Sequence, residues 1–442
     1  MLAGDSAFFH NGSAQREAAV DSSLDVARWD SSKKRFNEAS IEDQAPPLAS
    51  LRDPGWAIPR RRQASPDSAG TAGADPEAPQ PRYTESPIYP YLETNVDFLP
   101  MQFSQELISA DKTDLSISLY GAAIPFRHDS VMQRYAQELV NQNGYQDFAE
   151  YNTAVERVEG VGGEWKAMFR KGDEHSDYWW VEWFEAVVVA SGHYWLPYVP
   201  HIDGFEEFER DPPGSVIYSK QHRGSDAFKG KVVVVGASVS AADTVFDSTK
   251  SAGAPIQAVV LGHTGNPYIG DEAFNHPLIH KRPSIARVGA DTRTMHFVDG
   301  TSIASVDHLI FGTGHTWALP FPPQVPVRNN RVPGLYQHLV WRDDPTLLFV
   351  GAVGAVGAGL TFMIFEWQAV YAARILAGRG TIPPLEERSR WERERVEEKS
   401  VGAKFTTVFP DVEDYLETLP RLVGPPQKGN GRALPPFEKE WE

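Results

Sequence analysis

The chain has 442 residues, of which 41% are hydrophobic and 23% are charged, a composition typical of a soluble globular protein with more than one domain. The net charge of −17 argues against nucleic acid and anionic membranes as partners, and the absence of cysteine excludes disulfides, thiol catalysis and cysteine metal sites. No run reaches the roughly 18 apolar residues of a membrane span and the start lacks a signal-peptide pattern, so we expect a cytoplasmic protein. We also expect no metal site.

The first part of the chain carries little structural signal. Residues 1–30 are polar and weakly patterned. Residues 63–82 are rich in Pro, Ala, Ser and Gly, which predicts a disordered insertion or linker. We expect order to begin near Pro87.

The next part alternates one helix with short strands. Residues 128–143 predict a helix, because Val131, Tyr135 and Leu139 recur on one face. Three strands are predicted after it, the last two forming a hairpin: residues 152–158, 164–170 and 177–183.

Residues 231–243 read KVVVVGASVSAAD and predict a strand buried on both faces, a turn of small residues and the start of a helix. This order is that of the first unit of a dinucleotide site, where the turn approaches a pyrophosphate and the helix N-terminus attracts it. Gly236, Ser238 and Ala241 follow the G-x-G-x-x-G spacing with two substitutions. An ordinary turn between strand and helix in any α/β protein is the alternative.

The second strand of this unit is predicted over residues 257–261. In NAD sites an acid at the end of that strand binds the ribose 2′-hydroxyl. Here residues 262–265 read GHTG, with no acid, which favours NADP over NAD. Lys281 and Arg282 could approach a 2′-phosphate, with surface solvation as the alternative.

A repeated pattern brackets the unit. Residues 186–193 read AVVVASGH and residues 309–315 read LIFGTGH, and each predicts a buried strand that ends at a glycine. Cofactors bind at such strand ends in open α/β sheets. The repeat therefore predicts a domain inserted into another, with the two strands as entry and exit. Two unrelated strand ends are the alternative.

The last predicted strand covers residues 346–350, and a glycine-rich turn follows it. Thr361 is the expected N-cap of a helix over residues 362–377 that ends at Gly378. Such a helix N-terminus is a second place for a polar or anionic cofactor group. The charged residues 383–400 predict a solvated helix.

Taken in order, these segments resemble the fungal flavin-containing monooxygenases over residues 86–424. The segments that carry the resemblance are PIYPYLETNVDFLPMQFS, AVVVASGHYWLPYVPHIDG, GASVSA, LIFGTGH, LYQHLVWRDDPTLLFVG and EWQAVYAARILAGR. The resemblance implies an α/β fold with two Rossmann-like nucleotide-binding domains, the NADP domain inserted into the FAD domain. The implied parts are an unassigned start (1–30), an FAD-binding domain in two pieces (31–195 and 317–442) and an NADP-binding domain (196–316).

The resemblance also implies the chemistry of an NADPH- and FAD-dependent monooxygenase. In that family a hydride passes from NADPH to FAD, the reduced flavin forms a C4a-hydroperoxide with molecular oxygen, and a soft nucleophile (an amine or sulfide) takes the distal oxygen. The implied partners are a small-molecule substrate and oxygen, and a homodimer is left open. Two alternatives also stay open: a catalytically impaired or dead NADP-binding remnant, and a Baeyer–Villiger oxygenase acting on ketones.

By the same resemblance Asn95 is the catalytic residue, with its amide at the flavin edge and the bound NADP; a turn residue after Thr94 is the alternative. Gly192 and Gly314 would let the backbone approach the cofactors. The complete implied cofactor-binding set is Thr94, Leu99, Gln102, Ser191, Gly192, Gly236, Ser238, Ser240, Ala241, Gly312, Thr313, Gly314 and Thr361.

Four further polar residues have more than one interpretation. His193 and His315 are expected to form hydrogen bonds at strand ends rather than to catalyse. Glu366 and Gln368 lie in the helix that the resemblance places near the flavin, with core packing or solvation as the alternative.

Two segments depart from the family pattern. Residues 1–30 contain no apolar strand followed by G-x-G-x-x-G, the family's anchor for the FAD pyrophosphate. The identifying motif F-x-G-x-x-x-H-x-x-x-Y/F falls on Pro212, Gly214, Tyr218 and His222, where only Gly214 agrees. We therefore expect the chain as written to bind FAD weakly and to expose a strand edge in the FAD domain.

Overall fold

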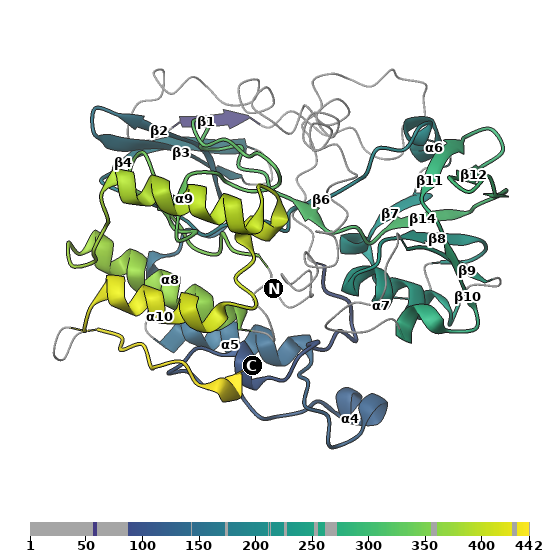
Figure 1. Ribbon diagram of the computed structural model, residues 1–442, viewed down its shortest axis with the longest axis horizontal. Coiled ribbons are helices and arrows are strands. Elements are labelled where there is room, and N and C mark those ends of the chain that lie inside the picture. Colours follow the sequence, from purple (N-terminus) through teal and green to yellow (C-terminus); the bar gives the residue numbers. More distant parts are fainter. Residues whose placement is uncertain are drawn as a thin grey trace.

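The computed structural model describes residues 56–59, 87–142, 144–172, 176–210, 212, 214–224, 228–251, 255–260, 272–354, 360–426 and 431–441. These residues form two α/β units side by side (Figure 1). We call residues 198–314 the insert and the remaining described residues the body. Residues 1–30 and 63–82, for which the sequence predicts an irregular start and a linker, lie outside the described residues.

A five-stranded parallel sheet forms the centre of the insert, in the order β10-β9-β8-β14-β7. Its strands are β7 (Val216–Tyr218), β8 (Val232–Val235), β9 (Ile256–Val259), β10 (Ile279–Arg282) and β14 (His308–Phe311). β8 lies between β9 and β14, and its four valines are at most 8% exposed. This burial on both faces explains why the sequence shows a continuous apolar run rather than alternation.

Helices and a small second sheet cover the two faces of the parallel sheet. α7 (Val239–Ser248) starts directly after β8 and packs Ala241, Ala242 and Val245 against Val232 and Val234. The other elements of the insert are α6 (Phe205–Arg210), η8 (Ser219–Gln221), η10 (Glu272–Asn275), β11 (Ile285–Gly289), β12 (Thr294–Phe297) and β13 (Ser302–Ile303). β12 supplies Met295 and Phe297 to the opposite face.

The body has its own sheet, in the order β16-β17-β18-β5. Its strands are β5 (Val187–Val189), β16 (Leu335–Tyr336), β17 (Val340–Trp341) and β18 (Leu347–Phe349). β5 pairs in parallel with β18 and has no second neighbour among the described strands. Val188, the middle residue of β5, is 40% exposed.

The chain enters and leaves the insert through one short antiparallel pair, β6 (Leu196–Pro197) with β15 (His315–Thr316). β5 of the body sheet comes directly before β6, and β14 of the insert sheet comes directly before β15. The two repeated strands therefore lie at entry and exit, and the predicted fold class is confirmed: α/β, with one Rossmann-like unit inserted into another.

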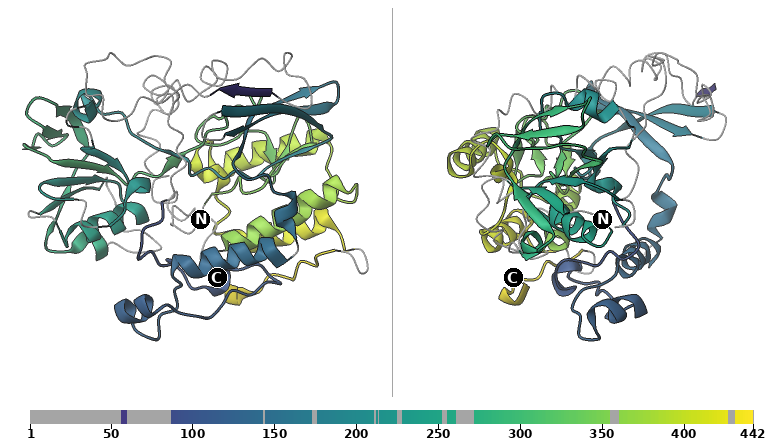
Figure 2. Two further views of the ribbon diagram at one scale, coloured as in Figure 1. Left: turned by 180° about the vertical axis from the view of Figure 1, so that it is seen from behind. Right: turned by 90° about the vertical axis from the view of Figure 1, so that its right-hand side faces the viewer.

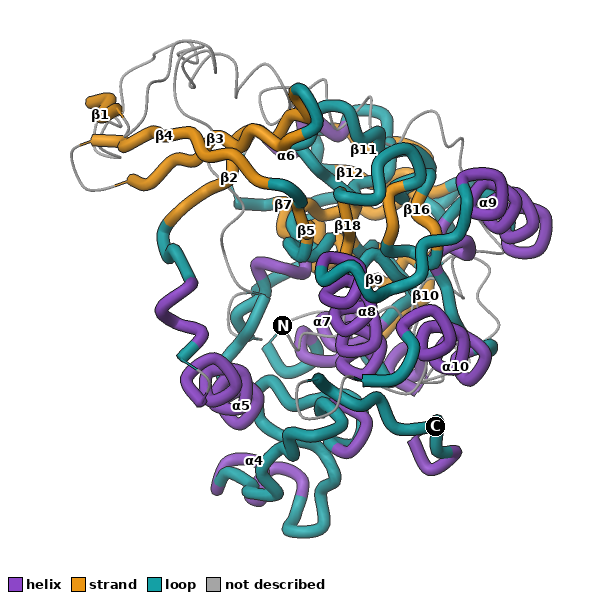
Figure 3. Tube along the Cα trace, turned by 90° about the vertical axis from the view of Figure 1, so that its left-hand side faces the viewer, coloured by secondary structure: helices purple, strands orange, loops and turns teal. Residues whose placement is uncertain are grey.

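An antiparallel sheet projects from the body, in the order β1-β4-β3-β2 (Figure 3). Its strands are β1 (Trp56–Pro59), β2 (Thr153–Val161), β3 (Glu164–Gly172) and β4 (Ser176–Phe184). The sequence predicts the last three and their hairpin, whereas β1 is too short to give a period-two pattern.

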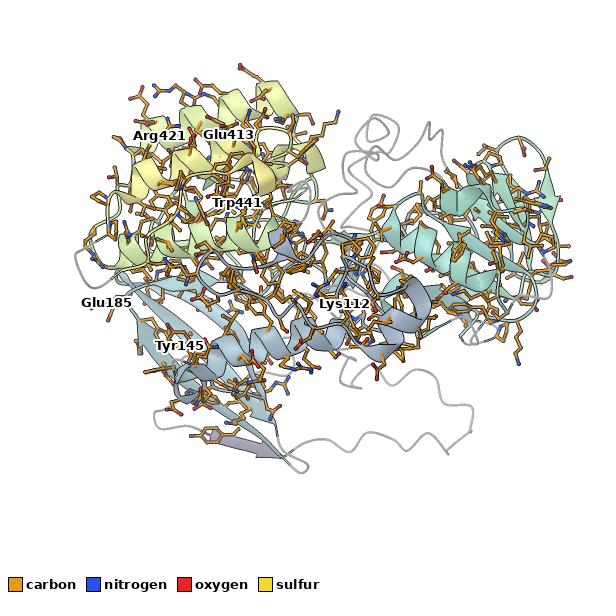
Figure 4. All side chains as sticks on the ribbon, turned by 90° about the horizontal axis from the view of Figure 1, so that it is seen from below. Lys112, Tyr145, Glu185, Glu413, Arg421 and Trp441 are labelled. Atoms are coloured by element: carbon orange, nitrogen blue, oxygen red, sulfur yellow. The ribbon has the colours of Figure 1, made fainter. Side chains whose placement is uncertain are left out.

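Three helices of the C-terminal part pack with the body: α8 (Thr361–Leu376), α9 (Leu385–Lys399) and α10 (Val412–Val423). Trp367 and Tyr371 of α8 are fully buried in the main core, and Trp441, labelled in Figure 4, packs edge-on against Trp367 with ring centroids 6.2 Å apart. The other helical elements of the body are η6 (Leu99–Met101), α4 (Asp114–Tyr120), α5 (Asp129–Gln142), η7 (Tyr145–Phe148), η11 (Ala403–Thr406) and η12 (Lys439–Trp441). Figure 2 shows α5 alongside α8, where Val131 and Tyr135 pack on Phe362.

Two expectations for the C-terminal part need correction. The N-cap of α8 is Leu360, and Thr361 is the first helical residue. The helix α9 is more than a solvated surface, because Arg388 is buried and donates to the carbonyls of Trp341 and Arg342. The long aliphatic stem of an arginine can pack in the protein while its guanidinium forms hydrogen bonds, so a charged sequence can still contain a buried residue.

No helix of the described residues is long and apolar enough to span a membrane.

Candidate functional site

The turn between β8 and α7 is packed too tightly for side chains. Gly236 has φ +138°, and a Cβ there would lie 2.3 Å from the carbonyl oxygen of Gly312. A Cβ on Gly312 would lie 2.6 Å from Cα of Ala241, on the first turn of α7. The sequence groups Gly236, Ala241 and Gly312 as cofactor-binding residues, and the structure brings all three into contact. Their immediate role is to let the end of β14 meet the start of α7.

Ser238 gives this turn a polar group that makes no hydrogen bond to the described residues. It is the N-cap residue of α7, yet its side chain makes no capping hydrogen bond. Its Oγ is buried and has no hydrogen-bond partner among the residues that the structure describes. A hydroxyl beside the positive end of a ten-residue helix can donate to a phosphate oxygen. Ser240, on the same turn, is half-buried. These residues fit the pyrophosphate of a dinucleotide.

The second strand of the insert, β9, ends just before residues that the structure does not describe, and residues 262–265 are among them. Lys281 and Arg282, on the adjacent β10, are both engaged within the protein. Lys281 donates to Asn275 Oδ1 at 2.9 Å, and the Nε of Arg282 donates to Gln257 Oε1 at 2.8 Å. The preference for NADP therefore stays a prediction from the sequence.

At the crossover between the two units lie four implied cofactor residues: Ser191, Gly192, Thr313 and Gly314. Gly192 has φ +71° and Gly314 has φ +84°, and a Cβ on either would meet no atom within 4 Å. The backbone N–H of Tyr198 donates to Gly314 O at 2.8 Å, and the hydroxyl of Thr313 donates to Tyr198 O. Both glycines thus combine a left-handed conformation with open space beside the backbone.

His193 and His315 lie in the aromatic packing of the same crossover. The ring of His193 stacks on Trp317, with centroids 4.4 Å apart and an interplanar angle of 18°. His315 contacts the ring of Tyr194 edge-on at 5.6 Å, and both histidines are buried. Ring packing is therefore a role for each of them that the sequence does not predict.

The block that contains Asn95 is attached to the body just before α5. Thr94 is buried, and its N–H donates to Arg127 O at 2.8 Å. Its Oγ1 accepts from Arg127 N at 3.0 Å and donates to Val96 O at 2.9 Å. Thr94 thus fixes the loop, whereas Asn95 is half-buried and its side-chain amide makes no hydrogen bond to the described residues. Fixed backbone with an uncommitted amide is compatible with ligand contact.

Leu99 and Gln102 follow in the same block as Asn95, in a part of it that packs against α8. η6 packs on α8, and Phe103 meets Phe362 edge-on with centroids 5.5 Å apart, beside Thr361. Leu99 is 53% exposed, while Gln102 accepts from the N–H of Ile108 at 3.0 Å. The residues that the sequence predicts on the flavin side thus form two groups, one near the start of α8 and one at the crossover.

Glu366 and Gln368 are buried parts of the body and not solvated residues. Glu366 accepts hydrogen bonds from the backbone N–H and hydroxyl of Ser104, at 2.7 and 2.6 Å, and pairs with Arg432. Gln368 accepts from the N–H of Gly351 at 2.8 Å. The core-packing interpretation of both residues thus describes what the structure shows.

A buried network that the sequence does not predict connects the insert to the body. Asp247, on α7, accepts from the hydroxyl of Tyr91, from His222 Nε2 at 3.1 Å and from Lys250 Nζ at 2.7 Å. Burial alone would raise the pKa of Asp247, but the hydrogen bonds from His222, Lys250 and Tyr91 outweigh it and lower the pKa to about 2. The carboxylate is therefore charged at neutral pH. Its partners lie up to 156 residues away in sequence, so no local pattern could reveal them.

Comparison with known proteins agrees with this geometry. Residues 121–269 and 273–426 match the family described as "Flavin-binding monooxygenase-like". The flavin-containing monooxygenase ustF2 of Aspergillus flavus is 26% identical over 326 residues, which cover 66% of this chain and 65% of that protein. The trimethylamine monooxygenase of Methylocella silvestris is 29% identical over 338 residues, 73% of this chain and 69% of that protein.

Among solved structures, S-allyl-L-cysteine S-oxygenase from Allium sativum shares the fold, with a TM-score of 0.64, 24% identity and 78% coverage of each chain. The chain spans less than two thirds of the length of the Aspergillus flavus relative. The family match covers more than half of the chain and includes the turn at Gly236, the crossovers and α8. The chain belongs to the flavin-binding monooxygenase-like family.

Proposed function

We propose that the protein is an NADPH- and FAD-dependent monooxygenase that transfers one oxygen atom to a soft nucleophile, an amine or a sulfide. The observation that carries the proposal is the turn before α7, where the N-cap residue Ser238 has a buried hydroxyl without a partner among the described residues. The relatives add the substrate class, because one is named for trimethylamine and another for the sulfur of S-allyl-L-cysteine. Cyclohexanone monooxygenase also shares the fold, with a TM-score of 0.51 and 12% identity, so the Baeyer–Villiger alternative stays open.

In this proposal each group of residues has a separate task. Gly236, Ser238 and the first N–H groups of α7 hold the NADP pyrophosphate, while Gly192 and Gly314 leave room for cofactor beside the backbone. Bound flavin would supply the redox chemistry, in which NADPH, a proton and dioxygen yield NADP⁺, water and one oxygen atom for the substrate. The amide of Asn95 orients the cofactors by donating and accepting without a change of charge. A cytoplasmic location and a homodimer stay predictions from the sequence.

Nucleotide choice gives the first test. We expect NADPH to bind more tightly than NADH, because residues 262–265 offer no acid to a ribose 2′-hydroxyl. Equilibrium titration of the isolated protein with both nucleotides measures the difference. NADH binding as tightly as NADPH would contradict the expectation.

The role of Asn95 gives the second test. Asn95→Leu should leave anaerobic flavin reduction by NADPH nearly unchanged, and should raise hydrogen peroxide release at the expense of oxygenated product. Stopped-flow reduction and a peroxide assay in flavin-loaded protein measure the two steps separately. If reduction and product formation both stay at the parental level, Asn95 is a turn residue only.

A second candidate, an NADP-binding protein that has lost oxygenation, rests on the same turn before α7, which would bind NADP in either case. Residues 1–30 also contain no G-x-G-x-x-G segment. The absorbance of flavin in the purified protein separates the two candidates. Stoichiometric FAD supports the monooxygenase, and protein that binds NADPH but takes up no FAD supports the remnant.

A further inference from the structure

A short segment of the body is attached to both units at once. The carbonyls of Pro90 and Leu92 accept hydrogen bonds from His128 Nε2 and Asp129 N, each at 3.0 Å, just before and at the start of α5. The side chain of Tyr91, between them, donates to Asp247 on α7 of the insert. Neighbouring residues are therefore fixed to different halves of the molecule.

The aromatic residues around Tyr91 strengthen the attachment to the insert. Tyr89 meets the ring of His222 edge-on, with centroids 5.2 Å apart, and meets Tyr91 at 4.9 Å. His222 is buried and donates through Nε2 to the same carboxylate as Tyr91. Burial and the nearby Asp243 and Asp247 raise the pKa of Tyr89, so its hydroxyl stays neutral.

We propose that the Tyr91–Asp247 hydrogen bond is a latch that fixes the insert relative to the body, with Asp247 as a positioning residue for hydride transfer. Asn95 lies four residues after Tyr91, and α7 carries the proposed pyrophosphate site at its other end. The latch thus sets the distance between the nicotinamide nucleotide and the flavin-side block. The role in hydride transfer rests on the proposed function, whereas the role in joining the halves does not.

The Tyr91–Asp247 hydrogen bond ends on a buried carboxylate, unlike a contact between exposed side chains. The side chain of Asp247 is 9% exposed and that of His222 is 3% exposed, so their hydrogen bonds are shielded from water. A charged acceptor with three donors holds each of them more strongly than a neutral acceptor would. Loss of the Tyr91 hydroxyl removes one hydrogen bond between the units but leaves His222 and Lys250 on the carboxylate.

A distance measurement tests the latch without any cofactor. The chain has no cysteine, so spin labels can be placed at two introduced cysteines, Ala286→Cys on β11 of the insert and Glu413→Cys on α10 of the body. Both positions are exposed, and Glu413 is labelled in Figure 4. We expect Tyr91→Phe and Asp247→Asn to broaden the distance distribution between the labels. The matched control is Tyr371→Phe, which removes a buried hydroxyl that donates to Thr381 O at 2.6 Å within the body and should leave the distribution unchanged.

A kinetic split tests the positioning role. In flavin-loaded protein, Tyr91→Phe should lower the rate of anaerobic flavin reduction at saturating NADPH by about tenfold, because a displacement on the order of 1 Å slows a positioned reaction steeply. The dissociation constant for NADPH should change by less than about twofold, because the pyrophosphate turn is intact. Distributions as narrow in Tyr91→Phe and Asp247→Asn as in the parent overturn the latch. Broad distributions with a parental reduction rate overturn the positioning role alone, and a parent that never reduces flavin counts against the proposed function while the distances still decide the latch.

Discussion

Two all-valine strands of this chain differ in burial and in the number of strands that pair with them. β8 and β5 are both parallel strands made only of valine, and each is followed by a turn with glycine. β8 lies between β9 and β14, and its residues are at most 8% exposed, whereas β5 pairs only with β18 among the described strands and exposes 40% of Val188. A strand made only of valine is predicted to be buried on both faces. Whether it receives a second neighbour is decided by a segment elsewhere in the chain.

The difference between the two strands also separates the two proposed cofactor sites. In the insert, the central strand, the turn and the helix that hold a pyrophosphate form one continuous segment. In the body, the described residues supply a strand with an open edge, a crossover and the start of α8. The described residues of the insert thus include the strand, turn and helix of the proposed pyrophosphate site, and those of the body include the crossover and the start of α8.

The largest expected effect comes from placing a charge in each strand. Val234→Asp should destabilise the protein by on the order of 4 kcal/mol, because Val234 is fully buried and an unpaired carboxylate would be desolvated. Val188→Asp should cost about 1 kcal/mol, because the side chain is already half in water. Urea unfolding followed by circular dichroism measures both.

Tryptophan fluorescence then assigns the loss to one unit, because residues 198–314 contain no tryptophan. Val234→Asp should shift the dichroism transition to lower urea more than the fluorescence transition. Equal costs for the two substitutions would show that β5 is as enclosed as β8.

The second prediction concerns the proposed flavin site. We expect the chain as written to bind FAD weakly, because residues 1–30 offer no G-x-G-x-x-G segment. Joining a strand–GxGxxG–helix segment from a close relative to the start should tighten FAD on the order of 100-fold, since two hydrogen bonds to a charged pyrophosphate each contribute about 1.5 kcal/mol or more. Flavin absorbance and NADPH oxidation measure the gain. Stoichiometric FAD in the unextended chain would show that residues 1–30 form a pyrophosphate site that the sequence does not reveal.

Local sequence predicts the strand, turn and helix of the insert for a physical reason. The strand, the small turn and α7 are consecutive, so the valines, Gly236 and the helix are visible in one window. The same logic finds α5, α8 and α9 within two residues at each end. The pairing of β5, which has one neighbour among the described strands, and the Tyr91–Asp247 hydrogen bond depend on partners far away in sequence. No local pattern around β5, Tyr91 or Asp247 indicates those partners.

The third prediction compares one glycine of the packed turn with one of the open crossover. Gly312→Ala should cost about 3 kcal/mol, because its Cβ would lie 2.6 Å from Cα of Ala241 and neither backbone can move without separating β14 from α7. Gly314→Ala should cost about 1 kcal/mol, because only the left-handed backbone at φ +84° opposes it and no atom lies within 4 Å. The shift in the urea midpoint measures each change. A larger cost for Gly314→Ala would mean that the crossover is packed as closely as the nucleotide turn.

The last prediction separates binding from folding at a single hydroxyl. Ser238→Ala should weaken NADPH about tenfold, because a hydrogen bond from a hydroxyl to a charged phosphate contributes about 1.5 kcal/mol. It should leave the free energy of unfolding nearly unchanged, because Ser238 Oγ has no partner among the described residues and makes no capping bond. The control is Ser248→Ala at the other end of α7, where the hydroxyl donates to Thr244 O at 2.6 Å and NADPH affinity should not change. Calorimetric titration with NADPH and urea unfolding measure the two quantities on the same preparations. A loss of stability in Ser238→Ala without a loss of affinity would assign this hydroxyl to the fold and remove it from the nucleotide site.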